Sequence, residues 1–336
     1  MKTFILIISL SLLSFFAHAK IWRVNNVPGI TADFTTAQAA HDGANANDTI
    51  YLESSPNPYG NLITSKKLTW IGLGYFLAQN PGLQFHSNAG TLNDITVNTG
   101  SDGSVFEINM LFNTLYINSC ANITFKRCYL RGSIYMINTV NHVTITESYL
   151  DLGNGALQVA PSPSSQFGFT FTNNIMVINY VGINANSYQV TFNNNTVITN
   201  GGGNSYVIDN ATVANNIFYN TAVGSLYDAG YPSNVTNNLW TGTTNAGFVG
   251  SNGNIYASDP NTVFVFNSSP DGKYKLAAGS PATGTGAGNV DMGAYGGADT
   301  YVVSVLPAIP TIYQLSVPAN ATGSTLPCSV STRANN

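Results

Sequence analysis

Apolar and polar residues alternate in a short phrase that recurs six times between Asn122 and Trp240. The phrases are ITFKRCYL, VTITESYL, FTFTNNIMV, VTFNNNTVI, TVANNIFY and VTNNLW. Each contains a polar pair, and the second residue of that pair is the anchor on which the phrases align: Cys128, Ser148, Asn174, Asn195, Asn216 and Asn238. Successive anchors lie 20, 26, 21, 21 and 22 residues apart, and a period near 20 indicates stacked repeats.

Two columns of this alignment are apolar in every repeat. Three residues before the anchor stand Phe125, Ile145, Phe171, Phe192, Val213 and Val235, and two residues after it stand Leu130, Leu150, Met176, Val197, Phe218 and Trp240. Four residues before the anchor stand Thr124, Thr144, Thr170, Thr191, Thr212 and Asn234. This period of two predicts strands with outward Thr and one buried face.

The length of the repeat restricts the architecture. A parallel connection through an ordinary helix needs more chain than one repeat offers, whereas three short strands joined by turns fit it. Equivalent strands of successive repeats then stack in parallel, about 4.8 Å apart. The pattern predicts an all-β protein, a parallel β-helix or solenoid.

The anchor column supports the same fold. Asn tolerates the left-handed conformation that a turn requires, and stacked Asn side chains bond to the Asn above and below. The alternative is a polar loop rich in Asn, but loops do not keep flanking apolar columns in register. We expect an internal asparagine ladder.

With these repeats the chain resembles the right-handed parallel β-helix proteins of the pectin-lyase-like superfamily, over about Lys67 to Gly297. The resemblance implies a right-handed solenoid and a function connected with polysaccharides. The superfamily's pectate lyases carry W-I-D-H and R-x-P-x-x-R motifs, and its polygalacturonases carry N-T-D, D-D, G-H-G and R-I-K. None of these strings occurs here, so no catalytic residue is transferred.

The segments before and after the repeats have their own predicted roles. An apolar run after Lys2, followed by Ala17-His18-Ala19, predicts a secretory signal peptide that is too short to span a membrane stably. We expect no transmembrane span after its cleavage, and a secreted, extracellular, cell-surface or periplasmic protein. The predicted parts are a signal peptide at 1–19, an N-terminal strand and helical cap at 20–66, coils at 67–258, a closing segment over the last coil at 259–300, and a Pro-containing β tail or linker at 301–336.

The N-terminal cap is predicted from a short amphipathic helix. Asp33 or Thr35 is positioned to cap it, and it ends near Gly43. Its apolar side carries Phe34, Ala37, Ala40 and Ala44. Laid across the first coil, such a helix blocks edge-to-edge pairing of strands.

Charge and cysteine usage exclude several classes of function. The formal net charge is −4, so nucleic acid is not an expected partner. The three Cys give no disulfide framework, and the four His have no ligand spacing. We expect no metal, no cofactor and a monomer. Cys128, in the anchor column, is expected to be a small buried filler.

The densest charge lies in two adjacent repeats. Arg127 and Glu147 share one column, and Arg131 and Asp151 share another. A lyase needs a base and a cation beside a uronate, and a glycoside hydrolase needs two carboxylates, so these four residues are the catalytic candidates and Lys126 is the substrate-binding candidate. The alternative is plain cross-strand ion pairing.

The expected function is binding of a polysaccharide or cell-surface glycan, and processing of the bound chain is left open. A neutral face with Tyr180, Tyr188, Tyr206, Tyr219, Tyr227 and Tyr231 offers rings that stack on sugars. The competing class is a non-catalytic adhesion or structural module. A remote alternative is an ice-binding Thr face, although Lys126, Asn193 and Ala214 interrupt its second column.

Overall fold

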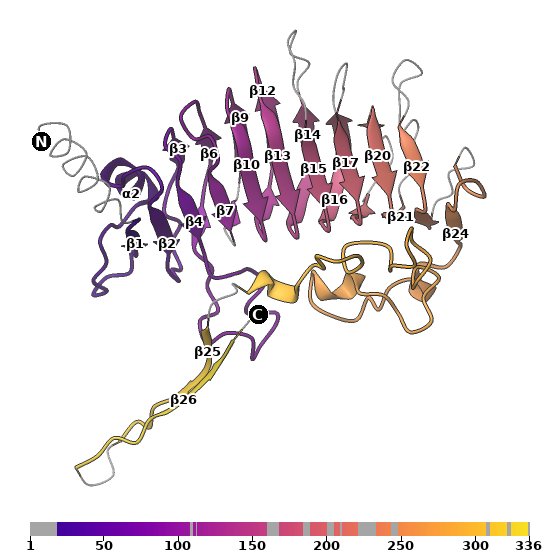
Figure 1. Cartoon of the computed structure of the whole chain (residues 1–336). Helices are drawn as coiled ribbons and strands as arrows, with labels where there is room; N and C mark the ends of the chain where they lie inside the picture. The colour runs from indigo at the N-terminus through magenta and orange to yellow at the C-terminus, as the bar shows by residue number, and fades with distance from the viewer. Residues whose placement is uncertain are drawn as a thin grey trace, which may run out of the picture.

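The computed structural model describes residues 19–107, 110–111, 113–159, 168–183, 189–199, 205–208, 210–220, 233–242, 248–306, 310–320 and 324–334. The predicted signal peptide lies outside these residues, apart from its last one. Within them the chain forms a parallel β-solenoid with one short helix at its N-terminal end (Figure 1). The predicted fold class is therefore confirmed.

One face of the solenoid is a ten-stranded parallel sheet, which we call the first face. Its strands, in spatial order, are β1 (Ile21–Val24), β2 (Thr49–Leu52), β4 (Thr69–Ile71), β7 (Val105–Glu107), β10 (Ala121–Lys126), β13 (Asn141–Thr146), β15 (Phe169–Thr172), β17 (Val190–Asn193), β20 (Ala211–Ala214) and β22 (Asn234–Thr236).

A second sheet of fourteen strands bends around a corner and forms two further faces. The second face comprises β5 (Thr91–Leu92), β8 (Met110–Leu111), β11 (Tyr129–Arg131), the beginnings of β14 (Tyr149–Val159) and β16 (Ile175–Ile183), β18 (Thr196–Ile198), β21 (Ile217–Tyr219), β23 (Leu239–Thr241) and β24 (Ile255–Ala257). The third face comprises β3 (Leu62–Thr64), β6 (Ile95–Val97), β9 (Thr114–Asn118), β12 (Ser133–Ile137), the ends of β14 and β16, and β19 (Ser205–Ile208). Three short strands per coil were predicted.

Both predicted apolar columns point into the solenoid. Strand pairing places Phe125 beside Ile145 and continues through Phe171 and Phe192, and these side chains are fully buried. The column two residues after the anchor is stacked in the same way, from Leu130 to Trp240, and belongs to the same core. In-register stacking of similar side chains fills each layer of the interior and removes apolar area from water.

The anchor residues form the predicted internal ladder. The backbone N–H and the side-chain amide of Asn174, Asn195 and Asn216 each donate to Oδ1 of the next anchor, over 2.8–3.1 Å. The ladder continues from Asn238 to Asn254, one coil beyond the predicted anchors. All of these side chains are buried, so the ladder satisfies polar groups where water does not reach.

The turn conformation is displaced by one residue from its predicted place. Left-handed φ angles of 50–59° occur at the residues just before the anchors, namely Arg127, Glu147, Asn173, Asn194, Asn215 and Asn237. The anchors themselves point inward. The prediction that the ladder Asn takes this conformation is wrong, because the preceding residue makes the corner.

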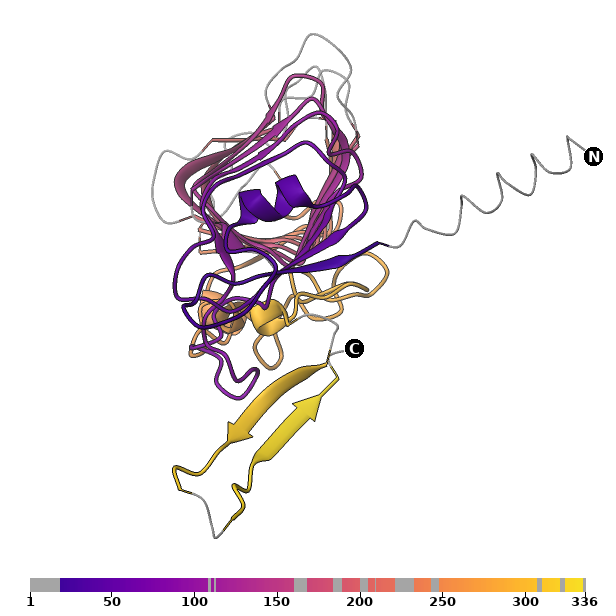
Figure 2. The ribbon, with the colours of Figure 1, turned by 90° about the vertical axis from the view of Figure 1, so that its left-hand side faces the viewer.

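The helical cap is confirmed, with a different capping residue. Helix α2 (Ala37–Gly43) begins after Thr36, whose side chain accepts a hydrogen bond from the Ala39 N–H, so neither Asp33 nor Thr35 is the cap. Ala37 and Ala40 are fully buried in the solenoid core. Figure 2 shows α2 lying across the open end of the first coil.

The segment 259–306, which we call the return segment, does not cover the last coil as predicted. It contains the 3-10 turns η2 (Pro260–Thr262), η3 (Gly272–Tyr274) and η4 (Val303–Val305), and it runs back along the side of the solenoid toward the N-terminal coils (Figure 1). The residues at the coil corners hold it. Asn194 Nδ2 donates to the Asp291 carbonyl at 3.2 Å, and Asn173 Nδ2 donates to the Gly296 carbonyl at 2.6 Å.

A second hydrophobic core lies between the return segment and the second face. Ile175, Ile217 and Leu239 point outward from the strands and pack with Phe264 and Met292. Where the return segment covers them, the strands of this face are therefore buried on both sides, which explains their runs of consecutive apolar residues. At the last coil, Phe248 stacks on Trp240 with ring centroids 6.1 Å apart and helps close the main core.

The tail forms an antiparallel hairpin of β25 (Thr311–Ser316) and β26 (Ser329–Arg333), which projects from the solenoid (Figures 1 and 2). It meets the body where the Phe85 N–H donates to the Ile312 carbonyl at 2.9 Å. The sequence left a β tail or a linker open for this segment, and the described residues form a β tail. Cys120 and Cys128 are buried, and Cys328 is exposed.

Candidate functional site

The predicted charged cluster forms at the corners of two adjacent coils. Arg127 follows β10 and Glu147 follows β13, and both take the left-handed conformation. Arg127 Nε donates to Glu147 Oε2 at 2.7 Å, and Lys126 Nζ lies 3.1 Å from Glu147 Oε1. One carboxylate therefore binds both cations; the shared column predicted its pairing with Arg127 but not its contact with Lys126.

Glu147 is only 3% exposed. Arg127 beside it is also covered, and its Nη1 lies 3.5 Å from the carbonyl oxygen of Leu306 in the return segment. A polysaccharide therefore has no open surface through which to meet the Glu147 carboxylate. A structural ion pair accounts for this geometry better than a general base does, because a base must lie within hydrogen-bonding reach of the substrate.

The other predicted pair lies on the second face. Arg131 and Asp151 are partners in the strand register, and Arg131 Nε lies 3.6 Å from Asp151 Oδ2. Their side chains are 44% and 33% exposed, so water screens the pair. Tyr129 donates its hydroxyl to Asp151 at 3.0 Å, and burial together with this carboxylate raises the pKa of Tyr129.

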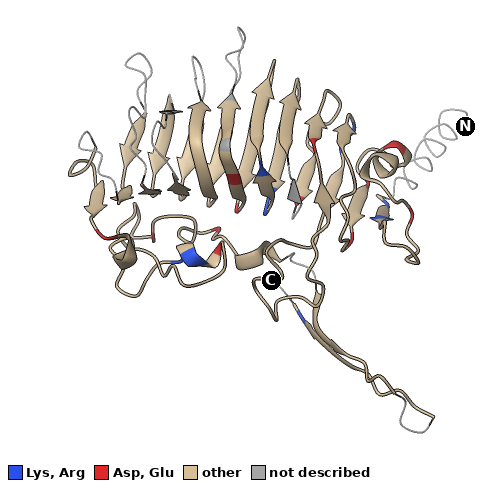
Figure 3. Ribbon diagram, turned by 180° about the vertical axis from the view of Figure 1, so that it is seen from behind, with Lys and Arg blue, Asp and Glu red and all other residues tan. Residues whose placement is uncertain are grey.

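The two carboxylates differ in accessibility, since Asp151 meets solvent and Glu147 does not. A hydrolase needs both carboxyl groups at one bond of the substrate. Figure 3 shows how few charged residues the strands carry beyond this region. The cluster is confirmed as two in-register ion pairs, and its catalytic role stays a prediction.

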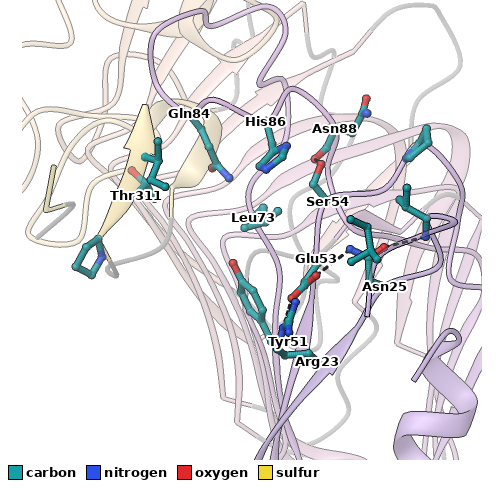
Figure 4. A pocket seen from close by; sticks show the side chains of 15 residues that line it. Arg23, Asn25, Tyr51, Glu53, Ser54, Leu73, Gln84, His86, Asn88 and Thr311 are labelled. Carbon is teal, nitrogen blue, oxygen red and sulfur yellow. Dashed lines mark hydrogen bonds and ion pairs between the residues drawn. The ribbon is translucent and has the colours of Figure 1, made fainter. Parts of the chain in front are cut away.

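A pocket of about 640 Å³ lies at the N-terminal end, where the first face, the segment 73–88 and the tail meet (Figure 4). Arg23 donates to Glu53, and Asn25 Nδ2 donates to the same carboxylate at 2.8 Å. Tyr51 stands beside them, and burial, followed by the charge of Glu53, raises its pKa to about 12. Gln84 Oε1 is buried in the pocket wall and has no hydrogen-bond partner among the described residues.

The third face carries an aromatic pair. Tyr116 on β9 and Tyr135 on β12 are register partners, with ring centroids 5.4 Å apart and planes inclined by 19°. Tyr116 is 38% exposed. The same row contains Thr96 one coil before the pair and Gln158 one coil after it. We call Thr96, Tyr116, Tyr135 and Gln158 the tyrosine row.

The tyrosines expected to form a sugar-binding face have different positions. Tyr180 is exposed on β16, whereas Tyr219 packs on Phe264 and Phe266 under the return segment. Tyr188, Tyr227, Tyr231 and the side chain of Tyr206 lie outside the described residues. Tyr116 and Tyr135 were missed, although TLYIN and SIYMI show the required alternation 19 residues apart.

The Thr column of the first face is continuous in register. Thr144, Thr170, Thr191 and Thr212 stand beside one another on successive strands. The neighbouring column is interrupted, as predicted, and at Asn193 the side-chain oxygen accepts the Ala214 N–H at 3.0 Å. The described surface therefore has one Thr row rather than the paired rows of an ice-binding face.

No three residues from His, Cys, Asp and Glu gather in the described part of the chain as metal ligands would. Within the same residues, no helix has both the length and the apolar character needed to cross a bilayer. Comparison with known proteins gives no relative: no family model matches the chain, and no curated protein matches its sequence.

Proposed function

We propose that this protein is a secreted, monomeric β-solenoid that binds polysaccharide on its third face, through the tyrosine row. The observation that carries the proposal is the pair Tyr116 and Tyr135, which are aromatic, in register and stacked at 5.4 Å on the outside of the solenoid. The likeness of the repeats to secreted β-helix proteins of the pectin-lyase-like superfamily supports the same class of ligand.

The geometry of the row suits a linear polymer. Successive coils are about 4.8 Å apart, a distance comparable to the length of one sugar ring, so a chain lying along the solenoid axis meets one row residue at each coil. Tyr rings supply apolar area and a hydroxyl, while Gln158 and Thr96 supply hydrogen-bonding groups for sugar hydroxyls. The row carries no charge, which favours neutral sugar units.

Binding without processing is the form of the proposal that the candidate site favours. Of the four catalytic candidates, Glu147 is buried in an ion pair and Asp151 is engaged by Arg131 and Tyr129. No described pair of these carboxylates opens on one groove. The non-catalytic adhesion module is therefore preferred over the lyase or hydrolase.

The test measures binding and turnover on the same samples. The protein is incubated with pectate, alginate, xylan, cellulose and mannan, and we expect retention on at least one of them without release of reducing ends or unsaturated uronates. Tyr116→Ala and Tyr135→Ala are expected to weaken that binding about tenfold, in line with the loss of a stacking aromatic side chain.

Tyr256→Ala is the matched control, because Tyr256 is similarly exposed but lies on β24 of the second face. Its affinity should equal that of the unmodified protein. Equal losses in all three variants, or no retention on any of the polymers, would contradict the proposal. If the unmodified protein released such products and Glu147→Gln did not, the protein would process the polysaccharide as well as bind it.

A further inference from the structure

We propose that a cavity between the return segment, the segment 79–83 and the tail binds a small acidic saccharide, held through its carboxylate. The cavity measures about 1000 Å³. It is separate from the tyrosine row, and the inference does not depend on the proposed polymer binding. Its walls join parts of the chain that are far apart in sequence, from Gln79 to Ala334.

The charge of the cavity defines the class of ligand. Its described lining contains three cations, Arg127, Lys275 and Arg333, and no Asp or Glu. Lys275 has no ion-pair partner among the described residues. Arg333 donates through Nη2 to the Leu83 carbonyl and forms no ion pair within the described part of the chain. The described lining therefore carries positive charge.

Two carboxylates lie behind this lining and are already occupied. Glu147 binds Arg127 and Lys126, as described above. Asp271 is fully buried and accepts hydrogen bonds from the Ser304 N–H at 2.7 Å and from Ser269 Oγ at 2.9 Å. Neither carboxylate lines the cavity, whereas Arg127, Lys275 and Arg333 do, so the positive lining favours an anion.

The remaining lining favours a sugar rather than a simple ion. A volume of about 1000 Å³ is at the upper end of the range for small-molecule sites and far exceeds the need of an inorganic anion. Aromatic walls come from Tyr295 and Tyr301, and amide and hydroxyl groups come from Gln79 and Ser268. Rings, hydroxyls and amides around a cationic centre match a short saccharide that carries a carboxylate.

The direct test is titration calorimetry of the full chain with trigalacturonate, and with galactotriose as its neutral counterpart. We expect saturable 1:1 binding of the acidic trimer and at least about tenfold weaker binding of the neutral one, because the charge-assisted contacts are lost. Lys275→Ala should weaken binding of the acidic trimer about fivefold or more, and higher salt should weaken it further.

The matched control is Lys273→Ala, since Lys273 lies on the same segment but does not line the cavity. This variant should bind the acidic trimer like the unmodified protein, and so should Tyr116→Ala, which tests the tyrosine row alone. Equal binding of the acidic and neutral trimers, equal losses in Lys275→Ala and Lys273→Ala, or competition by inorganic phosphate at equal concentration would overturn the proposal. Arg333→Gln gives a second variant, with circular dichroism to verify its fold.

Discussion

Asn195 and Asn216 are joined by two hydrogen bonds in the interior of the solenoid. Oδ1 of Asn216 accepts both the backbone N–H of Asn195, at 2.8 Å, and its side-chain amide, at 3.1 Å. One oxygen thus satisfies two donors of the preceding coil. Because the same unit repeats along the ladder, each coil fixes the position of the next.

Replacing Asn195 by Leu tests this unit. The change removes the Asn195 amide and leaves the Asn174 N–H without its acceptor, so we expect a loss of at least about 2 kcal/mol in the free energy of unfolding. Asn193→Leu is the control, because that partly exposed side chain accepts a single hydrogen bond. Urea denaturation measures both variants, and similar midpoints would exclude a stabilising ladder.

The return segment contributes a core of its own, which Phe264→Ala should disrupt. Phe264 is 1% exposed and contacts the rings of Tyr219 and Tyr274. Truncation of a buried Phe costs about 3–5 kcal/mol. The adjacent Val265 is more than one third exposed, so Val265→Ala should cost less than about 1 kcal/mol. If thermal unfolding showed that Phe264→Ala is as stable as Val265→Ala, the packing of the return segment would be disproved.

The two ion pairs should differ in their contribution to stability. Glu147→Gln leaves two cations beside a buried neutral amide, and we expect a loss of about 2 kcal/mol, below the range for fully buried pairs because Lys126 is partly exposed. Asp151→Asn breaks a pair in contact with water and should cost less than about 1 kcal/mol. Chemical denaturation of both variants at neutral pH makes the comparison. If Asp151→Asn lost more stability than Glu147→Gln, the burial of the Glu147 ion pair would be contradicted.

Stability should fall in acid partly through Asp48, at the N-terminal end of the solenoid. Burial opposes ionisation of this carboxyl, but hydrogen bonds from the Lys20 N–H and Trp22 Nε1, both at 2.8 Å, outweigh it and hold the pKa of Asp48 below its ordinary value. A lowered pKa in the folded state means that stability is fully present above the unfolded pKa of about 3.9 and is lost as pH falls through the folded value.

Melting temperatures measured between about pH 2.5 and 7 test this assignment. The melting temperature of the unmodified protein should fall below about pH 4. Asp48→Asn should have a lower melting temperature at neutral pH and a smaller fall in acid. If the melting temperature of Asp48→Asn fell in acid as steeply as that of the unmodified protein, other carboxyl groups would cause the pH dependence.

The columns that point into the solenoid could be predicted because they are periodic. Phe171 and Met176 lie at fixed distances from the anchor Asn174, and any other register would expose them. The outward column containing Ile175 and Ile217 was not assigned from the sequence. Its residues are apolar because the return segment covers them, and that segment has no repeat from which its course could be read.

The candidate site could also be predicted only in part. The pairing of Arg127 with Glu147 follows from one shared column in adjacent coils. The covering of Arg127 does not, because its Nη1 lies beside the carbonyl oxygen of Leu306, which is distant in sequence. Tyr116 lies before the first repeat, and Tyr135 lies outside the phrase on which the repeats align, so the alternation alone gave a weaker signal.

The course of the return segment also sets an order of folding. Coils can form one after another as the chain grows, since each pairs only with its neighbours. The outer apolar side of the second face, by contrast, stays uncovered until residues 259–306 exist, and the hydroxyls of Tyr75 and Tyr301, which lie 2.7 Å apart, meet only then. The return segment thus contacts one of the first coils only after all the repeats have been made. A chain interrupted before residue 259 leaves this apolar surface exposed to solvent. The exposed surface distinguishes such a chain from one in which residues 259–306 are present.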